Sequence, residues 1–428
     1  MQKFNIWKIF LLGLGFFGVS VIWSVYNAFV PVFLEERFAM AAGFIGMFMT
    51  MDNVAALFIQ PAVGAYSDSL RTRLGRRLPF ILIGAPIAAI AFIVLPLSKV
   101  LPVFFVSCVM LLLSMAIWRT PVVALMPDIT PSKYRSQANG IINFMGGLGT
   151  VIAFIVGAKL YDMDPVNHAY PFWLGSILVI LGAGLVLLFV REPKIYGKSE
   201  ENPPNVVQSV KAILNEKDKN TLLILGAIFF WFISYCGIEA FFTLFGKFRL
   251  HIPVSDGARL LSQLALVFLI FALPAGYIGS AFGRRRTILT GLAIMIASLA
   301  VMFFVPPMAL TKVFTSLPLI GKIRGVSFPM MAAGLGWAFI NINSLPMVVD
   351  MTDESHIGTF TGLYYLFSTL AAILGPTMYG WIVTLSGNMY SLIMMVSPFF
   401  MICAFVCMLF VKRGEAKTTE QTAIAKGD

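Results

Sequence analysis

The sequence predicts an all-α polytopic membrane protein, with twelve transmembrane helices arranged as two pseudo-symmetric six-helix bundles. Three observations predict it: the composition, the spacing of apolar stretches and an internal repeat. Of the 428 residues, 59% are hydrophobic and only 12% are charged, whereas soluble domains carry about a quarter charged residues. At about 20 apolar residues per span, the hydrophobic positions suffice for roughly twelve helices.

Charges and turn residues separate the apolar stretches. The first six spans are expected at 8–31, 41–66, 79–98, 101–126, 137–159 and 171–190, and the second six at 221–246, 258–280, 287–307, 326–349, 357–383 and 388–411. The first stretch is too long for a signal-peptide core, so we interpret it as a span. The chain thus divides into a bundle at 1–190, a linker at 191–220, a bundle at 221–411 and a tail at 412–428.

The basic residues predict the orientation. With a cytoplasmic N-terminus, 21 Lys and Arg fall on the cytoplasmic side and 9 on the outer side, which is the bias of the positive-inside rule. Both termini are therefore expected in the cytoplasm, and the protein in the cell (inner or plasma) membrane. The net charge of +11 suits loops that face anionic lipid, not nucleic acid. Helical spacing at 206–214 predicts a short surface helix in the linker, and the polar tail is expected to be disordered.

The two halves repeat one another. Four pairs match in order, the first two 208 residues apart and the last two 222 apart: Trp23 and Trp231, Gly75 and Gly283, Asp128 and Asp350, Gly140 and Gly362. The change of spacing indicates an insertion of about 14 residues, which we place in the outward loop at 308–325. Parallel repeats with a site between them are typical of carriers.

The loop after the second span carries a recognisable motif. Gln60 to Asp68 end the span, Arg71 and Arg73 follow, and Gly75-Arg76-Arg77 lead into the third span. This motif resembles the signature loop of the major facilitator superfamily, in the longer form of the sucrose and maltose–proton symporters. Residues 118–121, 341–346 and 358–365 resemble a bacterial branch of the same glycoside–pentoside–hexuronide-like group.

The same loop is a candidate gate. A carboxylate at Asp68 near clustered guanidinium groups can form ion pairs and bind helix ends, although the arginines could also serve topology alone. The gating candidates are Gly64, Asp68, Arg71, Arg73, Gly75, Arg76, Arg77 and Asp128, with Arg284 and Asp350 as their counterparts in the repeat.

Three ionisable residues lie inside predicted spans: Asp52, Arg119 and Glu239. Charges there are costly, which makes each a candidate for proton coupling. Two alternatives stay open: Asp52 and Arg119 could form a structural ion pair, and Glu239 could face the outer vestibule. The related melibiose-type sodium carriers have acidic residues where this chain has Ala56 and Gln60, which disfavours sodium. The resemblance also places the plant carriers' fourth-helix arginine at Val123, so Arg119, one turn earlier, is the candidate to replace it.

Sugar binding requires amide and hydroxyl groups for hydroxyls and aromatic faces for C–H surfaces. The spans expected to line the cavity supply both, although each group could instead bond a neighbouring helix. The candidates are Trp23, Tyr26, Asn27, Asn53, Gln60, Asn143, Tyr235, Asn341, Asn343, Tyr364 and Tyr365.

These observations predict a secondary active transporter that carries a disaccharide or related glycoside in symport with protons by alternating access. It would act as a monomer, with no cofactor or metal beyond the coupling proton. A carrier or proton antiporter of another solute, such as a drug, is the alternative. A membrane sensor is disfavoured because no signalling domain is appended. An enzyme is disfavoured because the three histidines, His168, His251 and His356, lie far apart in loops.

Overall fold

A computed structural model describes residues 6–130, 135–190, 192, 219–318, 320–352 and 357–414. Helices dominate the described chain, and twelve of its segments are long and apolar enough to cross a membrane. The first half contains α1 (Ile6–Glu36), α2 (Ala42–Met49), α3 (Met51–Ser69), α4 (Leu78–Val94), η1 (Leu95–Leu97), α5 (Leu101–Ile129), α6 (Arg135–Met163) and α7 (Tyr170–Phe189). The second contains α9 (Asn220–Phe248), α10 (Val254–Phe282), α11 (Arg284–Phe304), α12 (Pro307–Thr311), β1 (Val313–Leu317), β2 (Gly321–Arg324), α13 (Ser327–Val349), α14 (Ile357–Leu385) and α15 (Leu392–Phe410).

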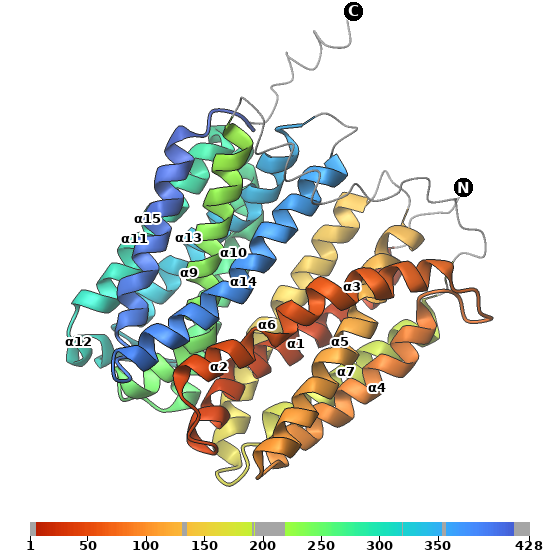
Figure 1. The fold of residues 1–428 in the computed structure, drawn as a ribbon, viewed down its shortest axis with the longest axis horizontal. Coiled ribbons are helices and arrows are strands. Elements are labelled where there is room, and N and C mark those ends of the chain that lie inside the picture. Colours follow the sequence, from red (N-terminus) through yellow and green to blue (C-terminus); the bar gives the residue numbers. More distant parts are fainter. Residues whose placement is uncertain are drawn as a thin grey trace, which may run out of the picture.

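The two halves form separate helix bundles that contact each other (Figure 1). Helix α1 packs on α6 and α7, and α9 packs in the equivalent way on α14 and α15. Between the halves, α2 contacts α14, α6 contacts α10 and α1 contacts α9. We call the end at which α1 begins and α15 ends the inner end, and the opposite end the outer end.

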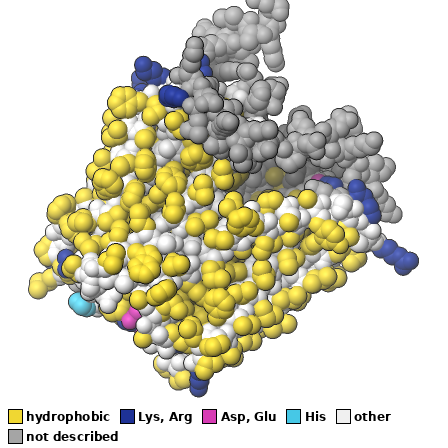
Figure 2. All heavy atoms as spheres, in the orientation of Figure 1, with side chains coloured by type: hydrophobic (Ala, Val, Ile, Leu, Met, Phe, Trp, Pro, Cys, Tyr) yellow, Lys and Arg dark blue, Asp and Glu magenta, His cyan; other side chains and the backbone are white. Residues whose placement is uncertain are grey.

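On the face of the molecule shown in Figure 2, apolar side chains cover the sides of both bundles, and Lys and Arg lie toward the ends. Large hydrophobic residues such as Phe58, Leu188 and Phe304 are at least 70% exposed. Such exposure of many large hydrophobic residues would be unfavourable in water but suits contact with lipid. The chain is therefore a multi-pass membrane protein.

The second span runs over Ala42–Ser67, which agrees with the stretch expected at 41–66, but its helix is divided into two. It breaks at Thr50, between α2 and α3. The Thr50 hydroxyl donates to the carbonyl of Met47 at 2.8 Å, a local bond that competes with helix continuation. The break puts Asp52 in the first turn of α3, where the partial positive charge of a helix N-terminus favours a carboxylate.

Small residues show where the halves meet. A Cβ built on Gly147 of α6 would lie 2.8 Å from Leu269 of α10. About two turns toward the inner end, a Cβ on Gly140 would meet nothing within 4 Å, and the same holds for its repeat partner Gly362 of α14. Near the outer end, in contrast, a Cβ on Gly46 would lie within 2.9 Å of the carbonyl carbon of Pro376. Among the described residues, the halves are thus in close contact at the outer end, whereas Gly140 and Gly362 near the inner end have no neighbour across the interface.

The expected outward loop at 308–325 is ordered. After the short helix α12, strands β1 and β2 pair antiparallel, with Val313 opposite Arg324 and Leu317 opposite Gly321. The insertion inferred from the repeat spacing therefore includes a β-hairpin. The linker helix expected at 206–214 lies outside the described residues, and so does most of the tail.

Candidate transport site and gates

Two carboxylates, one from each half, interact electrostatically across the interface between the bundles. Asp52 comes from α3 and Glu239 from α9, and both side chains are half-buried. They are close enough to interact electrostatically. Asn53 donates its amide to Asp52 at 2.8 Å, and Asn27 of α1 lies within hydrogen-bonding reach of Glu239. The interface between the halves thus holds two acids, each beside an amide.

Arg119 projects from α5 into the same region. Its side chain is exposed, although Trp118 and Val122 beside it are buried. It interacts electrostatically with Asp52 and with Tyr365 of α14, in the other half. Within the described residues, no carboxylate lies within 4 Å of its guanidinium group, so the structural ion pair with Asp52 is not formed in this conformation.

Aromatic groups of α1 lie next to the acids. Trp23 and Tyr26 meet edge to face with ring centroids 5.8 Å apart. The Trp23 Nε1 and the Tyr26 hydroxyl are buried without a hydrogen-bond partner, and Tyr26 interacts with Asp52. Buried polar atoms normally have partners, so these two are available to a ligand or water.

The second half contributes a stacked aromatic pair. Tyr235 of α9 lies flat on Trp337 of α13, with centroids 3.9 Å apart and an interplanar angle of 5°. Trp337 is absent from the residues predicted by sequence, although it lies one turn before Asn341 on the same helix. Tyr365 is 56% exposed, whereas the buried Tyr364 shares a 3.0 Å hydrogen bond with Ser344.

The remaining predicted amides differ in their surroundings. Asn341 on α13 and Gln60 on α3 are half-buried, and Asn143 on α6 is exposed. Asn343 is buried, and its amide donates to the carbonyls of Ala275 at 3.1 Å and Phe339 at 3.0 Å. The bond to Ala275 ties α13 to α10, and the bond to Phe339 lies within α13 itself. Asn343 is thus accounted for by helix packing, the alternative left open for every polar group in a span.

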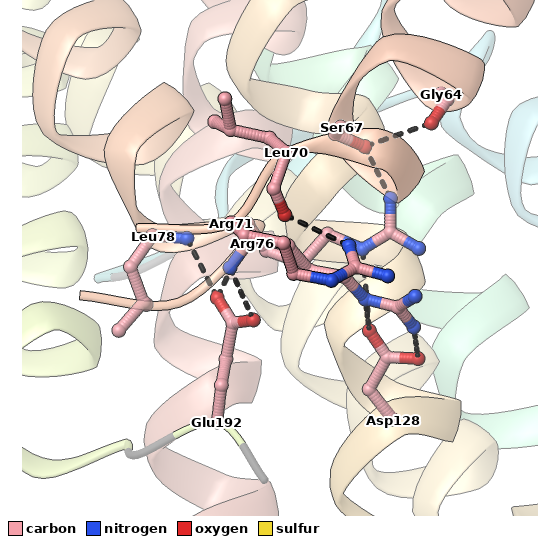
Figure 3. Close-up of polar contacts among 9 residues, drawn as sticks. Gly64, Ser67, Leu70, Arg71, Arg76, Leu78, Asp128 and Glu192 are labelled. Atoms are coloured by element: carbon pink, nitrogen blue, oxygen red, sulfur yellow. Dashed lines mark hydrogen bonds and ion pairs between the residues drawn. The ribbon is translucent and has the colours of Figure 1, made fainter. Parts of the chain in front are cut away.

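At the inner end, the signature loop is held by Asp128 of α5 (Figure 3). Arg76 donates to both carboxylate oxygens, at 2.6 and 3.3 Å. Arg77 donates from Nε to the same carboxylate at 3.2 Å and from its terminal nitrogen to Ser67 of α3. Forked arginine–carboxylate bonds are strong and directional, so this cluster fixes the loop to the rest of the first half.

Glu192, which follows α7, is a second anchor that the sequence analysis missed. Its carboxylate accepts the backbone N–H groups of Arg76, Arg77 and Leu78 at 2.7 to 2.8 Å (Figure 3). These are unpaired donors at the start of α4, where an anion is favourable. Gly75 has a φ of 117°, and a Cβ there would lie 2.5 Å from the Glu192 carboxyl. A Glu just past a span, at the same end of the bundle as an arginine-rich loop, is the signal that could have found it.

The counterparts of Arg76 and Asp128 in the second half are also in contact. Arg284 forms an ion pair with Asp350 and donates to the carbonyl of Pro346 at 2.9 Å, which repeats the Arg76–Asp128 pair in the second half. Arg71 bonds the carbonyl of Leu70 at 2.9 Å, and Arg73 is exposed. A Cβ on Gly64 of α3 would lie 3.7 Å from Thr120 of α5, an ordinary contact distance, so the approach of these helices does not require the glycine. The side chain of Asp68 lies outside the described residues.

The outer end carries contacts between the halves that were not predicted. Lys247 at the end of α9 pairs with Glu35 at 2.6 Å and Glu36 at 2.9 Å, both at the end of α1. Arg259 of α10 reaches Asp162 of α6 at 3.3 Å. These ion pairs span the interface, so they depend on the outer end being shut.

Two pseudo-symmetric helix bundles, polar groups buried between them and an interface shut at one end define a membrane transporter. The family model of the Major Facilitator Superfamily matches residues 12–333 and 260–426, and the chain belongs to that superfamily. It is therefore a transporter of a small molecule.

The chain is similar to transporters of several kinds. It is 21% identical to the class H tetracycline resistance protein of Pasteurella multocida, over 90% of each chain. It is 22% identical to the isoprimeverose transporter of Lactiplantibacillus pentosus, over 67% of this chain and 62% of that one. In fold it is similar to a bacterial homologue of the human lysosomal transporter Spinster, in an inward-facing and occupied conformation. That likeness has a TM-score of 0.73 at 17% identity and covers 95% and 96% of the two chains.

Proposed function

We propose that the protein carries a disaccharide or related glycoside in symport with protons. The observation that supports this most is the pair of carboxylates, Asp52 and Glu239, one from each half and close enough to interact. Two acids that face each other in an apolar interface repel when both are charged, so a proton on either one relieves the repulsion. Because they lie on different halves, rocking of the halves changes their separation and hence their proton affinity.

Arg119 fits this mechanism as a mobile counter-charge. It interacts with Asp52 without forming an ion pair, and its side chain is exposed. When Asp52 releases its proton, the nearby guanidinium group stabilises the new carboxylate. Release toward the inner end then leaves a neutral pair, and not an isolated buried charge.

The surroundings suit a sugar. The stacked rings of Tyr235 and Trp337, with Trp23 and Tyr26 opposite, supply aromatic surfaces for the C–H faces of a pyranose. Asn27, Asn53, Gln60, Asn143 and Asn341 supply amides for its hydroxyl groups. The isoprimeverose transporter among the relatives agrees with a glycoside.

The contacts at the inner and outer ends suggest the order of steps in a transport cycle. We assign the inner end to the cytoplasm, as the excess of basic residues at that end predicts. A proton and a sugar enter while the outer end is open and the signature loop joins the halves. The outer ion pairs then form, the inner end separates as in this structure, and both ligands leave.

Uptake into proteoliposomes tests the proposal. Labelled sucrose and maltose are supplied with and without an inward proton gradient, to wild type, Asp52→Asn and Glu239→Gln. We expect gradient-driven accumulation in the wild type and its loss in at least one variant. Exchange of labelled for unlabelled sugar needs no net proton movement, so a variant that loses accumulation but keeps exchange has lost coupling alone. Accumulation by the wild type that ignores the gradient would refute symport.

Proton-driven export of an amphipathic drug is the second candidate. It is favoured by the similarity to the tetracycline resistance protein, which extends over 90% of each chain. A symporter moves its solute in the same direction as the proton, whereas an antiporter moves it in the opposite direction. An acidic vesicle interior would drive accumulation of a labelled drug by an antiporter, whereas an acidic exterior drives accumulation of sugar by a symporter.

A further inference from the structure

The β-hairpin near the outer end has contacts that reach the interface between the halves. Arg324 in β2 donates to Asp256 of α10 at 2.5 Å and to the carbonyl of Thr311 at 3.1 Å. Arg259, one turn after Asp256, donates to the other oxygen of the same carboxylate at 2.9 Å. From there Arg259 extends to Asp162 of α6, in the opposite half. A series of four charged side chains, joined by ion pairs, therefore connects the hairpin to the first half.

The charges of the three members of this series that belong to the second half do not balance. Two guanidinium groups share one carboxylate, and that carboxylate is only 7% exposed. The cluster of Arg324, Asp256 and Arg259 consequently has a formal charge of +1. Asp162 supplies the missing anion, and it can do so only when the outer end is shut. Without Arg324, the Arg259–Asp256 pair would be neutral by itself and would attract Asp162 less.

The hairpin also shapes the space around Arg259. Gly321 has a φ of 81°, which side-chain-bearing residues rarely adopt. A Cβ on Gly321 would lie 2.7 Å from Cδ of Arg259. The turn therefore packs directly on the stem of this arginine, and the glycine leaves room for it. Backbone bonds from Gly325 to Lys312 at 3.0 Å and from Val326 to Leu310 at 2.8 Å fix the base of the hairpin.

We propose that the hairpin is a brace for the outer gate, which holds Arg259 in position to bind Asp162 and so stabilises the outer-closed state. The proposal rests on alternating access and is independent of the solute or the coupling ion. It assigns a purpose to the insertion that makes the two halves unequal: the outer gate gains a support that the first half does not have.

The test measures the conformation directly. Spin labels at Val166, in the loop between α6 and α7, and at Leu385, at the end of α14, report the opening of the outer end; both sites are more than 70% exposed. The four native cysteines are replaced first. Electron–electron distance measurements then compare Arg324→Gln with Lys322→Gln. The control removes the same charge from the same strand, and the Lys322 side chain is exposed and shows no ion pair in the described residues.

We expect Arg324→Gln to raise the ratio of outer-open to outer-closed protein by about two- to fivefold, the range of a partly exposed ion pair, and Lys322→Gln to leave it unchanged. Arg324 has no ion pair with the first half in the described residues, so its effect reaches the gate through the cluster that it forms with Asp256 and Arg259. A shift in Arg259→Gln without one in Arg324→Gln would overturn the brace while leaving the gate. If Arg324→Gln does not fold, Gly321→Ala is judged by the same criterion. No solute is present, so failure of sugar transport would not affect the result.

Discussion

The close contact between α2 and α14 gives the sharpest prediction, which concerns Gly46→Ala. A Cβ on Gly46 would lie 2.9 Å from the carbonyl carbon of Pro376, nearer still to its oxygen, and 3.2 Å from the Cα of Thr377. These are backbone atoms, which cannot rotate away. Helices α2 and α14 would have to separate by about 1 Å to restore ordinary van der Waals contact.

The cost applies to one conformation only. Overpacking of this kind typically costs about 1–3 kcal/mol, and here it is incurred when the halves meet at the outer end. When that end opens, the contact is released. The ratio of outer-closed to outer-open protein should therefore fall by about 5- to 150-fold. Gly380→Ala should act in the same direction, because its Cβ would lie 3.0 Å from the carbonyl carbon of Ala42.

The labels at Val166 and Leu385 measure this shift. Gly184→Ala on α7 is the matched control, since a Cβ there would meet nothing within 4 Å. We also expect slower release toward the inner end, because less protein occupies the inward-open state. If Gly46→Ala gave the same distance distribution as Gly184→Ala, the contact would not limit outer closure and the reasoning would be refuted.

Three further predictions concern charged groups outside the central site. Lys247→Met removes the ion pairs to Glu35 and Glu36, and all three side chains are 25 to 35% exposed. The variant should raise the outer-open fraction by about two- to fivefold in the same distance measurement. An unchanged distance distribution would contradict a role of these ion pairs in holding the outer end shut. Glu192→Gln should lower the free energy of unfolding by about 1–3 kcal/mol, because the carboxylate accepts three backbone N–H groups, and a melting temperature equal to that of wild type in detergent would disprove this. Hydrogen bonds from the backbone of Ala169, and then of Asn167 and Val166, hold the pKa of Asp164 below its ordinary value. The contribution of the Asp164 carboxylate to stability is therefore complete above the unfolded-state pKa of about 3.9. That contribution is lost as the pH falls through the lower folded-state pKa. Asp164→Asn should thus melt lower than wild type at pH 7, with a difference that shrinks on acidification, and a difference that grew on acidification would be inconsistent with that sign.

The sequence by itself determined the architecture. Hydrophobic runs long enough to span a bilayer must become helices, because backbone groups in lipid have to bond within their own segment. The same local rule places the polar residues by depth, so Asp52, Arg119 and Glu239 could be identified as intramembrane groups from position alone. The repeat gave Arg284 and Asp350 as counterparts of Arg76 and Asp128, and the structure contains both pairs.

Only the tertiary structure decided which groups meet. Arg119 and Asp52 are separated without an ion pair, Glu192 folds back onto a loop more than a hundred residues earlier, and Asn343 is used in helix packing. Three further contacts carry no local signal: Trp337 on Tyr235, Lys247 on Glu35 and the hairpin on Arg259. The physical reason is that hydropathy fixes how deep a residue lies, whereas rotation of each helix and the packing of small residues fix its direction. Depth is a property of a single segment, and contact is a property of two.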